Sequence, residues 1–266
     1  NALIAAGADV NKAMTDNGST PLIMASENGH FEVANALIAA GADVNKARTD
    51  DGTTPLYVAS ANGHNEVANA LIAAGADVDK AMTDHGVTPL IMASYNGHNE
   101  VANALIAAGA DVNKATRDIG LTPLIAASSN GHNEVANALI AAGANVNKAS
   151  TDNGATPLLI ASYYGHNEVA NALIAAGANV DKASTDIGAT PLIIASENGH
   201  NGVVTALIAA GADVNKAMTD NGSTPLIMAS ENGHFEVANA LIAAGADVDK
   251  ARTDNQASPT IVSVEF

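Results

Sequence analysis

The fold of this chain is decided by residues 15–48, which read TDNGSTPLIMASENGHFEVANALIAAGADVNKAR. The Thr-Pro-Leu that begins at Thr20 returns every 34 residues, at Thr54, Thr88, Thr122, Thr156, Thr190 and Thr224. A Gly-His pair follows each copy at a fixed offset, from Gly29-His30 to Gly233-His234. A constant period of this size is typical of a stack of small repeats, each of which contacts its neighbours.

The first half of each repeat predicts a short helix. Asp16-Asn17-Gly18 is a turn sequence, because Asp and Asn bond locally and Gly allows a positive φ. Thr20 can cap a helix that begins at Pro21, where the missing N–H of proline costs nothing. We expect this helix to cover residues 21–27 and to end at Asn28-Gly29.

The second half predicts a longer helix that starts near the Gly-His pair. The residue after His is Asn in most copies, for example Asn65, and Asn is a strong N-cap. Apolar side chains at i, i+3, i+4 and i+7 form one helical stripe, which consists of Val33, Ala36, Leu37 and Ala40. Gly41 ends the helix, and a polar extended loop leads to the next repeat. A single repeat cannot bury its apolar faces alone, so stacking must do it.

The composition limits the possible functions. Hydrophobic residues make up 47% of the 266 residues but aromatics only 3%, so the core should be thin and rich in alanine. The net charge of −17 opposes binding to nucleic acid or to anionic membranes. The absence of Cys excludes disulfides and thiolate metal sites. No apolar run approaches the roughly 20 residues of a membrane span. We expect a cytoplasmic rather than a secreted protein.

The repeat resembles the ankyrin repeat. The similarity lies in Asp-x-Gly-x-Thr-Pro-Leu (residues 16–22), Gly-His-x-Glu-Val (residues 29–33) and Gly-Ala-Asp-Val-Asn (residues 41–45), and extends over residues 1 to about 255. The resemblance implies an all-α solenoid of helix-turn-helix repeats with projecting hairpin-like loops. It also implies a concave side that binds proteins, without catalysis. Two departures are a repeat of 34 rather than 33 residues and Ile23, or an equivalent residue, where the family usually has His.

The repeat boundaries predict one array over residues 1–254. Residues 1–14 form a partial repeat, residues 15–252 form seven full repeats, and residues 253–266 form a degenerate C-terminal repeat or cap. The chain begins in mid-repeat and without Met, so we expect the natural N-terminus to lie beyond it.

The repeated histidines and acidic loops do not predict chemistry. Equivalent histidines on packed helices lie roughly 8–10 Å apart, whereas zinc ligands lie about 2 Å from one ion, so a structural role is favoured. The Asp43-Val44-Asn45 loop offers oxygen ligands but lacks the spacing of a calcium-binding EF-hand. The sequence contains no nucleophile elbow or phosphate loop. We therefore expect no enzyme activity, no cofactor and no metal.

The positions at which the repeats differ are the candidates for partner binding. They lie at the loop tip and in the first helix, which line the concave face in the family. Apolar and aromatic side chains gather there in the central repeats, a composition typical of binding hot spots. The candidate residues are Tyr57, His85, Tyr95, Ile119, Leu121, Tyr163, Tyr164 and Ile187. The alternatives are neutral drift at solvent positions and, for some residues, core filling.

A longer period suggests a second function. Residues 1–50 and 205–254 are identical at 48 of 50 positions, which indicates a duplicated block of 204 residues, or six repeats. The main hypothesis is a non-enzymatic scaffold that binds an unidentified protein partner. The alternative is a structural or elastic filament segment that associates head to tail through the bare helix expected at residues 1–4.

Overall fold

The computed structural model describes residues 6–250, and this part of the chain is built from paired helices without any β-strand. The first helices of the repeats are α2 (Pro21–Glu27), α4 (Pro55–Ala61), α6 (Pro89–Asn96), α8 (Pro123–Asn130), α10 (Pro157–Tyr164), α12 (Pro191–Glu197) and α14 (Pro225–Glu231). The second helices are α3 (Phe31–Ala39), α5 (Asn65–Ala73), α7 (Asn99–Ala107), α9 (Asn133–Ala141), α11 (Asn167–Ala175), α13 (Asn201–Ala209) and α15 (Phe235–Ala243). The predicted all-α helix-turn-helix architecture is therefore confirmed.

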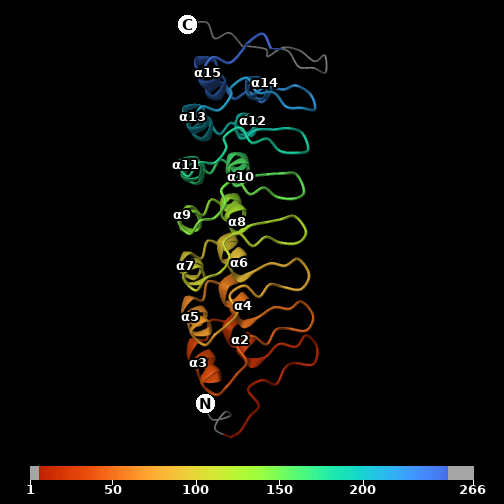
Figure 1. Ribbon diagram of the computed structural model, residues 1–266, viewed down its shortest axis with the longest axis vertical. Coiled ribbons are helices and arrows are strands. Elements are labelled where there is room, and N and C mark those ends of the chain that lie inside the picture. Colours follow the sequence, from red (N-terminus) through yellow and green to blue (C-terminus); the bar gives the residue numbers. More distant parts are fainter. Residues whose placement is uncertain (1–5, 251–266) are drawn as a thin grey trace. The chain divides into compact units, whose positions relative to one another are not determined.

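The chain divides into two compact units. The first unit comprises Asn1–Ala127 and Glu134–Ala144, and the second comprises Ser128–Asn133 and Asn145–Phe266. Within each unit the first helices lie between the second helices and the projecting loops (Figure 1). The helix expected at residues 1–4 and the end segment 253–266 lie outside the described residues, so head-to-tail association and the C-terminal cap stay predictions.

The first helices begin as the sequence predicts. In α2 the Thr20 Oγ1 accepts a hydrogen bond of 3.2 Å from the Ile23 N–H, and Pro21 is the first helical residue. The Ser26 hydroxyl is fully buried and donates to the Leu22 carbonyl at 2.7 Å, so it needs no partner in another element. The helix leads into Gly29, which has a φ of +67°.

The second helices begin one residue earlier than predicted. In α5 the N-cap is His64, whose carbonyl accepts a bond of 2.9 Å from the Ala68 N–H. Asn65 is the first helical residue and not the cap, so that prediction was wrong. Its Oδ1 accepts instead from Nδ2 of Asn69 at 2.9 Å on the exposed surface. Asn65 cannot cap because His64 already has the non-helical backbone, with a φ of −79° and a ψ of 77°.

The buried stripe of the second helices is narrower than predicted. In α5, which packs between α3 and α7, Val67, Ala68 and Leu71 are buried. In α3 the predicted Ala40 is exposed because it is the C-cap, after which the chain turns away at Gly41 with a φ of +87°. Small and branched residues at the contacting positions therefore carry the stacking.

Polar bonds join neighbouring loops as well. The projecting loop that follows Thr49 is closed by a bond of 2.8 Å from the Arg48 N–H to the Thr53 carbonyl. The Thr49 N–H reaches the Asn17 carbonyl of the preceding loop at 3.0 Å. On the other connection Nζ of Lys46 donates to the Asn11 carbonyl at 2.9 Å. These bonds explain why the polar loop residues repeat as faithfully as the core.

Candidate functional site

The repeated histidines hold neighbouring repeats together. Nε2 of His64 lies 3.0 Å from the Glu27 carbonyl, which belongs to the first helix of the preceding repeat. Because a carbonyl oxygen only accepts, Nε2 must carry the proton. Equivalent bonds are made by His98, His166, His200 and His234. The predicted structural role is confirmed at these positions. Within residues 6–250 no group of three or more His, Asp or Glu side chains is arranged to hold a metal ion.

In the first unit the predicted binding residues have different environments. Tyr95 is 48% exposed at the end of α6, and Ile119 is 43% exposed at a loop tip. Tyr57 and Leu121 are only half-buried, and Leu121 pairs its backbone with Thr116 across the loop. Burial raises the pKa of the Tyr57 hydroxyl above its ordinary value of 10.0, and two nearby carboxylates act in the same direction.

His85 is the distinctive loop-tip residue of the first unit. Its Nδ1 lies 3.0 Å from Oδ2 of Asp118 in the following repeat, and its Nε2 lies 3.6 Å from Oδ2 of Asp84. Its ring is exposed, so these contacts tie adjacent loop tips together without closing a cavity. The prediction that His85 contacts a partner stays a prediction.

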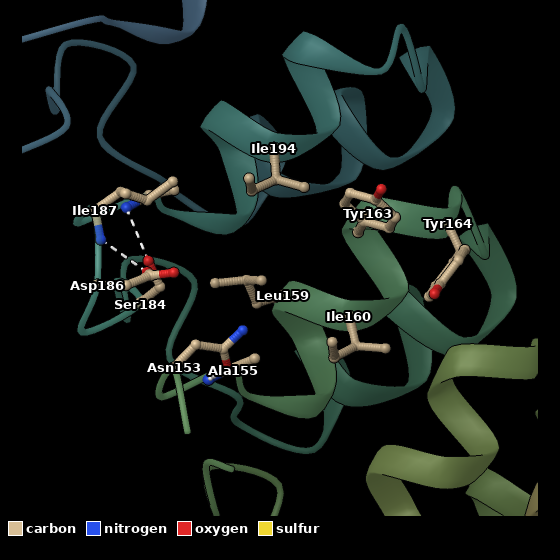
Figure 2. A pocket seen from close by; sticks show the side chains of 11 residues that line it. Asn153, Ala155, Leu159, Ile160, Tyr163, Tyr164, Ser184, Asp186, Ile187 and Ile194 are labelled. Atoms are coloured by element: carbon tan, nitrogen blue, oxygen red, sulfur yellow. Dashed lines mark hydrogen bonds between the residues drawn. The ribbon is translucent and has the colours of Figure 1, made fainter. Parts of the chain in front are cut away.

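In the second unit the structure brings together three predicted residues around one pocket. Tyr163 and Tyr164 end α10 and are about half exposed, with ring centroids 4.9 Å apart in an edge-to-face arrangement. Ile187, 36% exposed, lies on the loop that leads to α12. The pocket has a volume of about 320 Å³. Figure 2 shows Tyr163 and Ile187 on opposite sides of it, with Leu159 between them.

The remaining lining shows what sequence reasoning missed. Leu159 and Ile194 are buried and give the pocket an apolar wall, and Ile160 is half-buried beside them. Asn153 and Asp186 add polar groups from two consecutive loops. Ile160 and Ile194 occupy a position that varies among the repeats, so the signal that selected Tyr163 could also have selected them. The pocket face is defined here as Leu159, Ile160, Tyr163, Tyr164, Ile187 and Ile194.

Asp186 keeps a negative charge at the pocket. Its Oδ1 accepts a bond of 2.7 Å from the Ile187 N–H. The Ser184 hydroxyl and that backbone N–H lower the pKa of the Asp186 carboxyl below its ordinary value of 3.8. The Ser150 hydroxyl and the Asn153 N–H have the same effect on the pKa of Asp152 in the preceding repeat. Both carboxyl groups are therefore ionised at neutral pH.

Paired helices that stack with projecting loops define an all-α repeat solenoid. The family model for ankyrin repeats (three copies) matches residues 1–82, 46–116, 90–184 and 180–252. The chain thus belongs to the ankyrin repeat family, whose members are generally protein–protein interaction modules and typically not enzymes.

One solved structure of the same family shows how far the likeness extends. The crystal structure of the human ASB11 ankyrin repeat domain is 28% identical in sequence, with a TM-score of 0.75. The match covers 86% of this chain and 99% of that domain. A comparison with curated proteins found no match. No helix within residues 6–250 is long and apolar enough to cross a membrane.

Proposed function

We propose that this protein is a non-enzymatic interaction scaffold that binds a protein partner through the loop-bearing side of its first helices. The pocket face of the second unit is the centre of the site. The observation that supports the proposal is an exposed tyrosine pair that faces an exposed isoleucine across an apolar pocket. Tyrosine is enriched at binding hot spots because its ring buries a large area and its hydroxyl still reaches a polar partner.

The size of the pocket favours a side chain of a partner as the ligand. At about 320 Å³ it lies at the lower end of the roughly 300–1,000 Å³ of small-molecule sites. It lies between two first helices and the loops beside them, so a segment that runs along the repeats can place one residue in it. Half-exposed tyrosines at the rim then contact the neighbouring residues of that segment.

A peptide-display selection on the full chain tests the proposal. The wild-type protein should enrich peptides that share a sequence, and Tyr163→Ala with Ile187→Ser should weaken their binding at least about tenfold, as expected when hot-spot side chains are removed. Phe235→Ala is the matched control, because Phe235 is 55% exposed in the same unit but lies on a second helix. Circular dichroism should show unchanged helicity. Selected peptides that bind the double variant as well as the wild type would place the site elsewhere.

A further inference from the structure

Three carboxylates form a regular row on the loop tips of the second unit. Asp152, Asp186 and Asp220 occupy the same position in consecutive repeats, 34 residues apart, and all three are exposed. Oδ1 of Asp220 accepts from the Asn221 N–H at 2.6 Å, as Oδ1 of Asp186 accepts from the Ile187 N–H. These bonds fix the direction of each carboxylate and leave its charge at the surface.

Basic side chains do not neutralise this row. The tips at residues 149–155, 183–189 and 217–223 contain no Lys or Arg. No ion pair forms among the described residues of the second unit, and two of its lysines, Lys216 and Lys250, donate instead to the carbonyls of Asp181 and Asn215. The charge of Asp186 also opposes the ionisation of Asp152, which shows that adjacent tips repel.

The loop tips of the first unit are different. His85 lies between the carboxylates of Asp84 and Asp118, and the charge of Arg48 favours the ionised form of Asp51. Arg117 is itself a tip residue. The acidic row that lacks internal cations therefore lies beside the pocket face, and a cationic ligand would relieve its repulsion.

The spacing of the row indicates the conformation of that ligand. The helices α10, α12 and α14 pack in succession, so equivalent positions are roughly 8–10 Å apart. A polyproline II helix has 3 residues per turn and rises about 3.1 Å per residue, so every third side chain returns to one face after about 9 Å. In a β-strand every third side chain alternates between faces. An α-helix needs about seven residues for the same distance.

We propose, building on the function proposed above, that the second unit binds a polyproline II segment with Lys or Arg at every third position. One face of the segment pairs with Asp152, Asp186 and Asp220. A second face places an apolar side chain in the pocket between Tyr163 and Ile187. The third face points to solvent. The partner is thus a basic, proline-containing region of a protein.

Two peptides of identical composition test the spacing on the full chain. The first repeats Arg-Pro-Leu three times, and the second carries its three Arg residues consecutively, followed by alternating Pro and Leu. Fluorescence anisotropy at about 0.15 M salt should show that the first peptide binds at least about tenfold more tightly, because only it can pair with all three tips. Equal affinities, or tighter binding of a helical peptide with Arg at every seventh position, would overturn the proposal.

Charge-matched variants test the site. Asp152→Asn with Asp186→Asn and Asp220→Asn keeps the side-chain oxygen that accepts the backbone bond and removes three charges. We expect it to bind the Arg-Pro-Leu peptide about tenfold more weakly. Asp16→Asn with Asp50→Asn and Asp84→Asn removes the same charge from the first unit and should change the affinity less than about threefold. Equal losses in the two variants would show general charge attraction and overturn the assigned site.

The same proteins separate this inference from the function on which it rests. If display-selected peptides depend on Tyr163 and Ile187 but bind the second-unit Asn variant normally, the scaffold function stands and the basic ligand is wrong. If the Arg-Pro-Leu peptide loses affinity in both the second-unit Asn variant and Tyr163→Ala, the row and the pocket act on one ligand, as proposed.

Discussion

Gly29 leaves the space that the His64 ring of the next repeat occupies. A Cβ atom on Gly29 would lie 2.6 Å from Nδ1 of His64, and Gly29 has a φ of +67°. Gly41, in the same repeat, has a φ of +87°, but a Cβ there would meet no atom within 4 Å. The Gly-His pair of the sequence is therefore a contact between repeats, in which each glycine admits the histidine of its successor.

Alanine at these two glycines should separate backbone strain from this contact. Gly41→Ala should cost about 1 kcal/mol, because it only forces an L-residue into the left-handed region. Gly29→Ala should cost about 1–3 kcal/mol more, since the His64 ring must also move from its bond with Glu27. Urea denaturation of the single variants measures both differences.

A double-mutant cycle checks that cause. With His64→Ala already present, Gly29→Ala should cost about as much as Gly41→Ala, because the ring that it displaces is gone. An additive cycle would show that the cost of Gly29→Ala comes from its backbone alone.

The repeat pattern predicted the elements because local chemistry decides them. Thr20, Pro21 and Gly29 each specify a backbone conformation that depends on their own side chains. The start of the second helix was misplaced because His64 and Asn65 are both acceptable before a helix. The inter-repeat bond from His64 to Glu27 selects between them.

The candidate site was only partly predictable for a related reason. Differences among repeats drew attention to Tyr163 and Ile187, which do line one pocket. Asp186 escaped notice because it repeats in every copy, and repetition looks structural. What distinguishes Asp186 is the lack of a basic residue on the neighbouring loop tips, which emerges only when loops are compared in space.

Acid should destabilise the second unit partly through its loop-tip carboxylates. The pKa values of Asp152 and Asp186 are lower in the folded protein than their ordinary value of 3.8. Their contribution to the free energy of unfolding is thus present above pH 3.8 and is lost as the pH falls through the lower folded-state values. Asp152→Asn with Asp186→Asn should unfold with a weaker pH dependence below pH 3.8. Thermal melts from pH 7 downward test this, and parallel curves for variant and wild type would contradict it.

Alkaline pH should destabilise the first unit through Tyr57. Its pKa is raised above 10.0 by burial and by the carboxylates of Asp51 and Asp84, so the folded state favours the protonated hydroxyl. This contribution is complete below pH 10.0 and disappears as the pH rises through the folded-state pKa. Tyr57→Phe should therefore lose less stability than the wild type above pH 10. A spectrophotometric titration should also show that the variant lacks the phenolate that forms latest.

Gly202 is a glycine that alanine should improve. It lies in the first turn of α13, where the other described second helices have Glu, and its φ is not positive. A Cβ there would lie 2.5 Å from Nδ2 of Asn167, which is the far end of an exposed, flexible side chain that can turn away. Gly202→Ala should then stabilise the protein by about 0.5–1 kcal/mol through helix propensity. A destabilised variant that Asn167→Ala rescues would show instead that the Asn167 side chain is held in place by its packing.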